Sequence, residues 1–181
     1  MNLEVYFVDS FTKKVFSGNA AGVVFHSGEL TATTMQNIAF ENNLSETAFI
    51  DTSKGNEIKF YSPEVEVDLC GHATLASAFV YFNFINKEAN EIIFNSNRGQ
   101  LVAKRKDDAI VMSLPKDQPE RESDLDMFVD ALGCDVKEAY KGIDDYLAIL
   151  EDEETVKKLI PDIDKIAKMP SRGLIVSAKG K

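Results

Sequence analysis

The chain has 181 residues, of which 44% are hydrophobic and 28% charged, so it can bury a core in one domain or two small ones and is not a disordered chain. Its formal net charge of −10 argues against non-specific binding to nucleic acid or anionic membranes, and no apolar run approaches the roughly 20 residues that span a bilayer. It has only two cysteines and two histidines, without metal-ligand spacing, so we expect neither a disulfide framework nor a metal site. The N-terminal residues lack the basic flank of a secretory leader, which predicts a cytoplasmic protein.

The N-terminal part of the chain predicts short strands and one helix. β-Branched and aromatic residues predict strands at 3–8 and 23–26, and apolar residues at helical spacing predict a helix at 31–42. The segment between the two strands predicts a loop, in which glycines flank Asn19. Such glycines indicate either that the backbone approaches a ligand closely or that the chain bends tightly between strands, and the pattern leaves both open.

Glu46 lies in a predicted strand at 44–51. Alternation places Glu46 on one face with three apolar residues, Leu44, Ala48 and Ile50. A carboxylate in such surroundings either has partners or carries a raised pKa, and both are common at active sites. The alternative is that this face is an outer, solvated one, and the pattern by itself favours that alternative.

The stretch from 62 to 84 predicts the central element of the fold. A strand at 57–61 leads into it, and a helix over 71–84 is apolar nearly all round, which requires that protein surrounds it. Gly71 allows close approach of a ligand, and the first N–H groups of the helix have no intrahelical partner. These donors and the helix dipole suit a carboxylate or phosphate, with His72 beside them. An ordinary buried helix capped by Asp68 or water is equally compatible.

The remaining elements predict an α+β fold. Three short strands are expected at 91–96, 100–105 and 110–114, the first two joined by a hairpin turn at 97–99. A polar linker at 115–122 precedes a second set of elements, with helices at 125–132, 153–160 and 163–168 and strands at 146–150 and 173–178. No dinucleotide, P-loop or serine-hydrolase motif is present, so nothing indicates a cofactor.

Three segments carry a resemblance to a known family: FSGNAAGVV at 16–24, NNLSETAFI at 42–50 and FYSPEVEVDLCGHATLASA at 60–78. They resemble the phenazine biosynthesis PhzF family of diaminopimelate epimerase-like proteins, and the later RGQLVAKR and SRGLIVSAKG segments fit the same pattern. The resemblance implies two similar halves, each a mixed barrel-like β-sheet wrapped around a central buried helix, with the active site in the cleft between them. Residues 1–115 would form the first epimerase-like domain, with its central helix at 71–84, and 116–181 the start of a second, incomplete one.

The resemblance also implies an activity and its residues. The family is thought to contain cofactor-independent isomerases that move a proton on a small carboxylate-bearing substrate. Glu46 matches the catalytic acid/base, and Asn19, Gly71 and His72 match substrate-binding positions. Cys70 stands where racemases of this superfold use a thiol, but Cys134 is badly placed as the second thiol, so we interpret Cys70 as structural.

The sequence departs from the family pattern at its C-terminal end. Family members continue past SRGLIVSA into a second central helix with a motif resembling EDPVTGSAH, which this sequence does not contain. The chain is then a fragment or natural truncation, or oligomerisation supplies the missing wall of the cleft, or it no longer catalyses. Two hypotheses follow: a PhzF-like isomerase, or a catalytically silent binding or interaction module. Self-association as a homo-oligomer is expected on either hypothesis, because an incomplete cleft exposes apolar surface.

Overall fold

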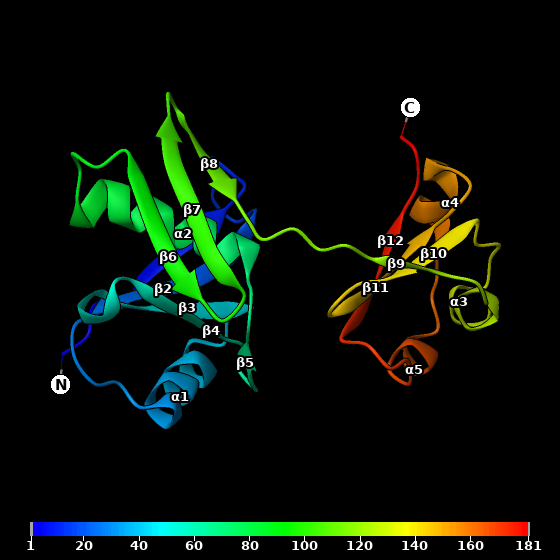
Figure 1. Cartoon of the computed structure of the whole chain (residues 1–181), viewed down its shortest axis with the longest axis horizontal. Helices are drawn as coiled ribbons and strands as arrows, with labels where there is room; N and C mark the ends of the chain where they lie inside the picture. Colours follow the sequence, from blue (N-terminus) through cyan, green and yellow to red (C-terminus); the bar gives the residue numbers. More distant parts are fainter. Residues whose placement is uncertain (1, 181) are drawn as a thin grey trace. The chain divides into compact units, whose positions relative to one another are not determined.

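The structure is a computed structural model that describes residues 2–180. The chain divides after Pro115 into two compact units, each with its own hydrophobic core (Figure 1). Among residues 2–180, no helix is both long enough and apolar enough to cross a membrane.

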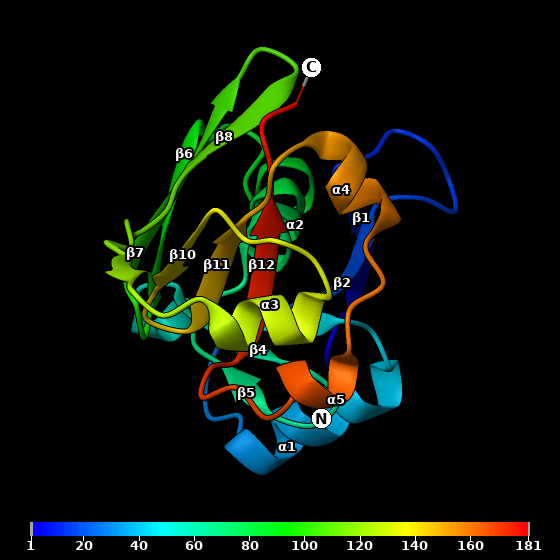
Figure 2. The ribbon, with the colours of Figure 1, turned by 90° about the vertical axis from the view of Figure 1, so that its right-hand side faces the viewer.

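The first unit is a mixed sheet curled around one helix, α2 (Gly71–Val80). The helix contacts strands from both ends of the sheet, so the sheet surrounds much of it (Figure 2). Neighbouring strands pair antiparallel except β2 with β3 and β4 with β6, which are parallel. In spatial order the strands are β1 (Tyr6–Ser10), β2 (Asn19–His26), β3 (Glu46–Asp51), β4 (Glu57–Tyr61), β6 (Glu91–Ser96), β7 (Gly99–Lys106) and β8 (Ala109–Ser113), with β5 (Glu66–Val67) pairing to β4.

Small residues explain why α2 fits inside this sheet. Ala73, Ala76 and Ala78 are fully buried, and they let the strands approach the helix closely. Two buried hydroxyls bond to the helix backbone: Thr74 donates to the carbonyl of Cys70 and Ser77 to that of Ala73, both at 2.7 Å.

The expected helix over 71–84 is correct only in part. Regular α-helix ends at Val80, and Tyr81–Ile85 forms a π-helical turn closed by a 2.7 Å bond from the Asn86 N–H to the Tyr81 carbonyl. Protein also does not surround the helix on every side. Phe79 is 42% exposed and lines a groove of about 840 Å³ with residues of β1 and of the turn between β7 and β8.

The other elements of the first unit lie near their predicted positions, but β1 is Tyr6–Ser10 rather than 3–8, and β2 begins four residues before the predicted strand at 23–26. The helix α1 (Ala32–Asn42) begins at the N-cap Thr31, whose side chain accepts from the Thr34 N–H, and a short 3₁₀ turn, Thr52–Lys54, follows β3. The expected loop around Asn19 is shorter than predicted, because Asn19 is the first residue of β2 and pairs with Ser10 of β1.

The second unit is a four-stranded sheet with three short helices. Buried Phe128, Leu132 and Tyr146 form the centre of its core. The sheet order is β12 (Gly173–Ser177), β11 (Asp145–Ile149), β10 (Glu138–Lys141) and β9 (Glu120–Glu122), and the helices are α3 (Asp126–Leu132), α4 (Glu153–Lys158) and α5 (Ile163–Ile166).

Two strands of this unit were not predicted. The predicted linker at 115–122 contains β9, whose three residues are all charged and show no apolar alternation. Its partner β10 has only four residues, and pairing stabilises both strands, with an ion pair between Arg121 and Glu138 across them. The strand β12 pairs only with β11 among residues 2–180.

Candidate functional site

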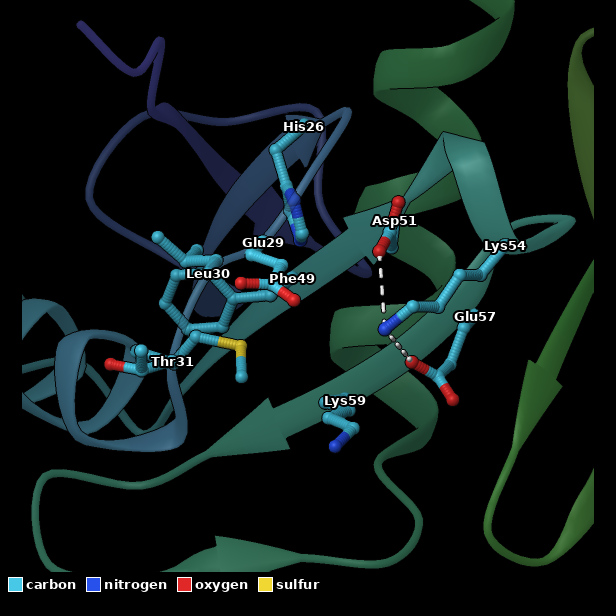
Figure 3. A pocket seen from close by; sticks show the side chains of 10 residues that line it. His26, Glu29, Leu30, Thr31, Phe49, Asp51, Lys54, Glu57 and Lys59 are labelled. Atoms are coloured by element: carbon cyan, nitrogen blue, oxygen red, sulfur yellow. Dashed lines mark ion pairs between the residues drawn. The ribbon is translucent and has the colours of Figure 1, made fainter. Parts of the chain in front are cut away.

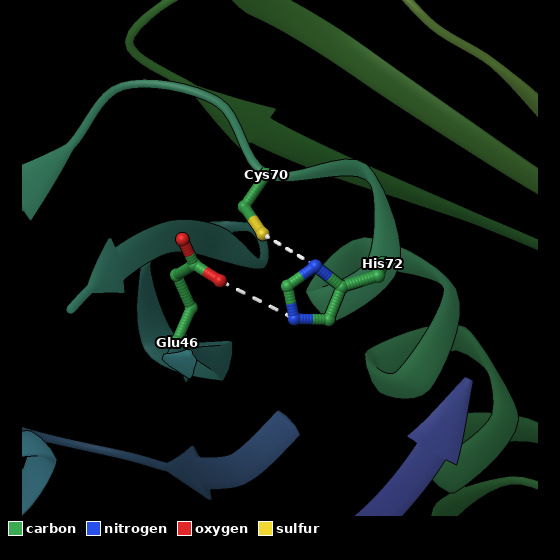
Figure 4. Close-up of side chains that lie close together, drawn as sticks. All are labelled: Glu46, Cys70 and His72. Carbon is green, nitrogen blue, oxygen red and sulfur yellow. Dashed lines mark hydrogen bonds and ion pairs between the residues drawn. The ribbon is translucent and has the colours of Figure 1, made fainter. Parts of the chain in front are cut away.

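Three ionisable side chains meet at the N-terminus of α2: Glu46, Cys70 and His72 (Figure 4). His72 Nε2 lies 3.3 Å from Glu46 Oε2, and His72 Nδ1 lies 3.3 Å from Cys70 Sγ. The imidazole therefore presents one nitrogen to each of its neighbours. The close-up shows the three polar ends pointing toward one another.

Strand register explains how Glu46 comes to face the helix. Glu46 is the first residue of β3 and pairs with Ala21 of β2, which is fully buried. Ala48 and Ile50, two and four residues further on, share the face of Glu46 and belong to the core around α2. The face is thus the inner one, and the outer, solvated alternative does not hold. The Glu46 side chain keeps 22% exposure, so solvent still reaches it.

The backbone of His72 is hydrogen-bonded to the last residue of strand β1. The Ser10 hydroxyl, 3% exposed, donates to the backbone carbonyl of His72 at 2.8 Å. The His72 side chain is 10% exposed, and its Nε2 is buried and makes no hydrogen bond among the described residues. When the ring is protonated, this atom and Glu46 form an ion pair. No sequence pattern indicated Ser10, because its role depends on where β1 ends.

Cys70 contributes a neutral thiol to the cluster. Burial is the main cause that raises the pKa of its thiol to about 12; the Glu46 carboxylate also raises this pKa, and the Ala73 and His72 N–H groups oppose the rise. A thiol in this state is a weak hydrogen-bond donor and a poor nucleophile. This agrees with a structural role for Cys70. In the second unit, partial burial and Asp135 raise the pKa of Cys134.

The other two predicted substrate-binding residues, Asn19 and Gly71, lie near the N-terminus of α2 but are not part of the cluster of Glu46, Cys70 and His72. Asn19 shares the inner face of β2 with Ala21, so it lies at the end of the sheet where β3 begins with Glu46. At Gly71, the first residue of α2, an added Cβ would meet only a methyl of Leu114, at 3.9 Å. The fold itself therefore does not demand glycine there, and the open space above it is available to a ligand.

A second polar hollow lies at the opposite end of β3 and has a structural explanation (Figure 3). It encloses about 340 Å³ and is lined by side chains that include Asp51 and Lys54. Asp51 accepts from the backbone N–H and hydroxyl of Ser53, at 3.0 and 2.6 Å, and pairs with Lys54 at 3.6 Å. Asp51 thus caps the 3₁₀ turn, and its lone pairs are engaged.

The arrangement at α2 suits proton transfer. A carboxylate, an imidazole and a thiol lie within reach of one another at a helix N-terminus, a position that favours anions. The sequence pattern of the phenazine biosynthesis-like proteins matches residues 8–181. The chain belongs to this family, the PhzF family.

Individual PhzF relatives cover the whole chain. An uncharacterized isomerase of Pseudomonas aeruginosa is 38% identical over 182 residues, covering 100% of this chain and 70% of the relative. The crystal structure of a PhzF family protein from Enterococcus faecalis superposes with a TM-score of 0.87 at 41% identity, covering 100% of this chain and 70% of that one. A PhzC/PhzF protein from Clostridium difficile gives 0.84 at 36% identity, covering 99% and 70%. The α+β fold is diaminopimelate epimerase-like, with a curled sheet around a central helix.

Proposed function

We propose that the chain is a PhzF-like isomerase that moves a proton on a small carboxylate-bearing substrate, with Glu46 as general acid/base. The observation that carries this proposal is the Glu46 carboxylate on the inner face of β3, 3.3 Å from His72 at the start of α2. Relatives named as isomerases support it. No cofactor enters the proposed reaction.

The proposed mechanism uses the helix end and the carboxylate together. The positive end of α2, at Gly71 and His72, binds the substrate carboxylate, and Asn19 binds a second polar group. Glu46 takes a proton from a carbon next to an electron-withdrawing group, and the electron pair of the broken C–H bond delocalises into an enolate-like system. Helix-end N–H groups stabilise that charge. Glu46 then returns the proton to another carbon or to the opposite face, so the carboxylate is regenerated.

Proton–deuterium exchange followed by NMR tests this function. Small cyclic and amino carboxylic acids are incubated in heavy water with the wild-type chain, with Glu46→Gln and with Glu64→Gln. Glu64 is an exposed carboxylate in the turn before β5, so its replacement serves as the matched control. The expected result is deuterium in one substrate with wild type and Glu64→Gln, and at least about a hundredfold slower exchange with Glu46→Gln.

Two results would argue against the proposal. Equal exchange by wild type and Glu46→Gln would remove Glu46 from the mechanism. A folded wild-type chain that exchanges no member of the panel, while carboxylates still shift resonances near Gly71, would favour the silent binding module. A cytoplasmic location and a homo-oligomer stay predictions; gel filtration with light scattering tests the second.

A further inference from the structure

The cluster at α2 combines three kinds of metal ligand: Cys70 and His72 from the start of the helix, and Glu46 from β3. One ligand atom each from Glu46, Cys70 and His72 lies within 4.8 Å of the other two. The ring of His72 is nine-tenths buried, and its Nε2 is buried without a hydrogen bond among residues 2–180. A buried nitrogen without a hydrogen bond, aimed at a carboxylate, is costly unless a proton or a cation joins them.

The spacing of the three atoms fits a tetrahedral ion. Zinc holds sulfur at about 2.3 Å and nitrogen or oxygen at about 2.0–2.2 Å, which places neighbouring ligand atoms roughly 3.4–3.7 Å apart. His72 Nε2 lies 3.3 Å from Glu46 and His72 Nδ1 lies 3.3 Å from Cys70, and a single ion takes only one of these nitrogens. With one ligand atom from each residue, no pair of atoms is more than 4.8 Å apart, so side-chain rotations that move atoms by about 1 Å bring the set into range. A thiolate, an imidazole and a carboxylate together suit zinc rather than magnesium or calcium.

We propose that Glu46, Cys70 and His72 form a three-ligand site for zinc or a similar soft divalent cation, and that the bound ion inhibits the isomerase. Binding replaces the thiol proton of Cys70, which passes to solvent as the S–Zn bond forms, and no group is oxidised or reduced. The fourth position of the ion stays open to water or to a substrate carboxylate. The inhibition rests on the proposed function, because the ion inhibits by keeping Glu46 from carrying a proton. The binding of the ion does not depend on the proposed function.

The composition of the chain supplies matched controls for this site. The chain has one further cysteine, Cys134, and one further histidine, His26, and both lie outside the cluster. Calorimetric titration of the full chain with Zn²⁺, and absorption spectra with Co²⁺, are compared for Cys70→Ser, His72→Gln, Cys134→Ser and His26→Gln. We expect one ion per chain for wild type and for the two control variants, and at least tenfold weaker binding for Cys70→Ser and His72→Gln. The thiolate-to-cobalt charge-transfer band should vanish only in Cys70→Ser.

X-ray absorption at the zinc edge of the wild-type complex avoids any folding defect of the variants. One sulfur at about 2.3 Å with nitrogen and oxygen at about 2.0–2.2 Å is expected. A coordination shell of oxygen and nitrogen alone, a charge-transfer band that persists in Cys70→Ser, or equal affinity of all variants would overturn the site. No saturable binding by wild type would do the same.

The inhibition is tested separately on the deuterium exchange. Zinc should abolish exchange over the same concentration range in which it binds, and a chelator should restore it. Undiminished exchange at saturating zinc would overturn the inhibition and leave the site. If the chain exchanges no substrate at all, the proposed function fails, and the titration and absorption results alone decide whether the metal site exists.

Discussion

The Ser10 hydroxyl donates to the backbone carbonyl of His72 at 2.8 Å and so joins the last residue of β1 to the first turn of α2. Both partners are far apart in the chain, and Ser10 is almost completely buried. A single hydroxyl thereby links the edge strand of the first unit to the helix end that carries the candidate site. The position of the His72 ring depends on this contact as well as on Cys70 and Glu46.

Replacing Ser10 with alanine should weaken both folding and the site. We expect the free energy of unfolding to fall by about 0.5–1.5 kcal/mol, the usual net value of an intramolecular hydrogen bond, as measured by denaturant titration. The affinity for a carboxylate ligand should also fall, because His72 loses a support. Ser27→Ala, at an exposed turn, is the control and should leave both quantities within error. A Ser10→Ala protein as stable as wild type would show that the bond contributes nothing.

Local patterns predicted part of this site: they grouped Glu46 with apolar residues on one face of a strand, although by themselves they favoured a solvated face. Period-two alternation places Glu46 with Ala48 and Ile50, and the structure has these three residues on the inner face of β3. The apolar run that starts at Gly71 likewise predicts where α2 begins. Both inferences need only the geometry of one element, which short stretches of sequence determine.

The contacts among the site residues could not be predicted, because they depend on pairing between distant segments. The meeting of Glu46 with His72 requires the parallel register of β2 with β3 and the packing of α2 against both. The role of Ser10 requires, in addition, the antiparallel pairing of β1 with β2. The strand β9 was missed for a similar reason: its charged residues have no intrinsic strand pattern, and only pairing with β10 makes them a strand.

Gly71→Ala separates a structural from a substrate-binding role of the glycine. The added methyl meets only Leu114 Cδ1 at 3.9 Å, so the melting temperature should be unchanged or slightly higher, since alanine is the better helix former. If the ligand approaches the backbone here, its affinity should fall at least tenfold, measured as KM or by NMR titration. Gly173→Ala in β12 is the control for the substitution itself. Unchanged affinity in Gly71→Ala would remove Gly71 from the proposed binding site.

The two cysteines should differ strongly in reactivity. Burial raises the pKa of the Cys70 thiol from 9.0 to about 12, which lowers its thiolate fraction near neutral pH about a thousandfold. In native protein, one equivalent of thiol, that of half-buried Cys134, should therefore react rapidly with a disulfide reagent. The second equivalent, that of Cys70, should react only when the protein is unfolded. Cys134→Ser should remove the fast phase and Cys70→Ser should leave it. Loss of the fast phase in Cys70→Ser would contradict the neutral, buried thiol.

Asp51 should make stability depend on pH through its contacts with Ser53. The Ser53 hydroxyl, more than the other groups around it, holds the pKa of this carboxyl below its ordinary 3.8 in the folded state. A lowered folded pKa means that the carboxylate stabilises the fold above about pH 4 and that this contribution is lost as pH falls through the folded value. Ser53→Ala should accordingly lower the free energy of unfolding by about 1–2 kcal/mol at pH 7, the range for a hydrogen bond to a charged group, and by less at pH 3.

The same substitution in an Asp51→Asn background shows whether the carboxylate is the cause. There, Ser53→Ala should have one effect at every pH, because no charge remains to titrate at position 51. Denaturant titrations of the four proteins between pH 3 and 7 measure this directly. A cost of Ser53→Ala that stays constant with pH in the presence of Asp51 would mean that the hydroxyl acts as an ordinary cap of the 3₁₀ turn. A cost that shrinks toward pH 3 only when Asp51 is present would assign the pH dependence to this one pair.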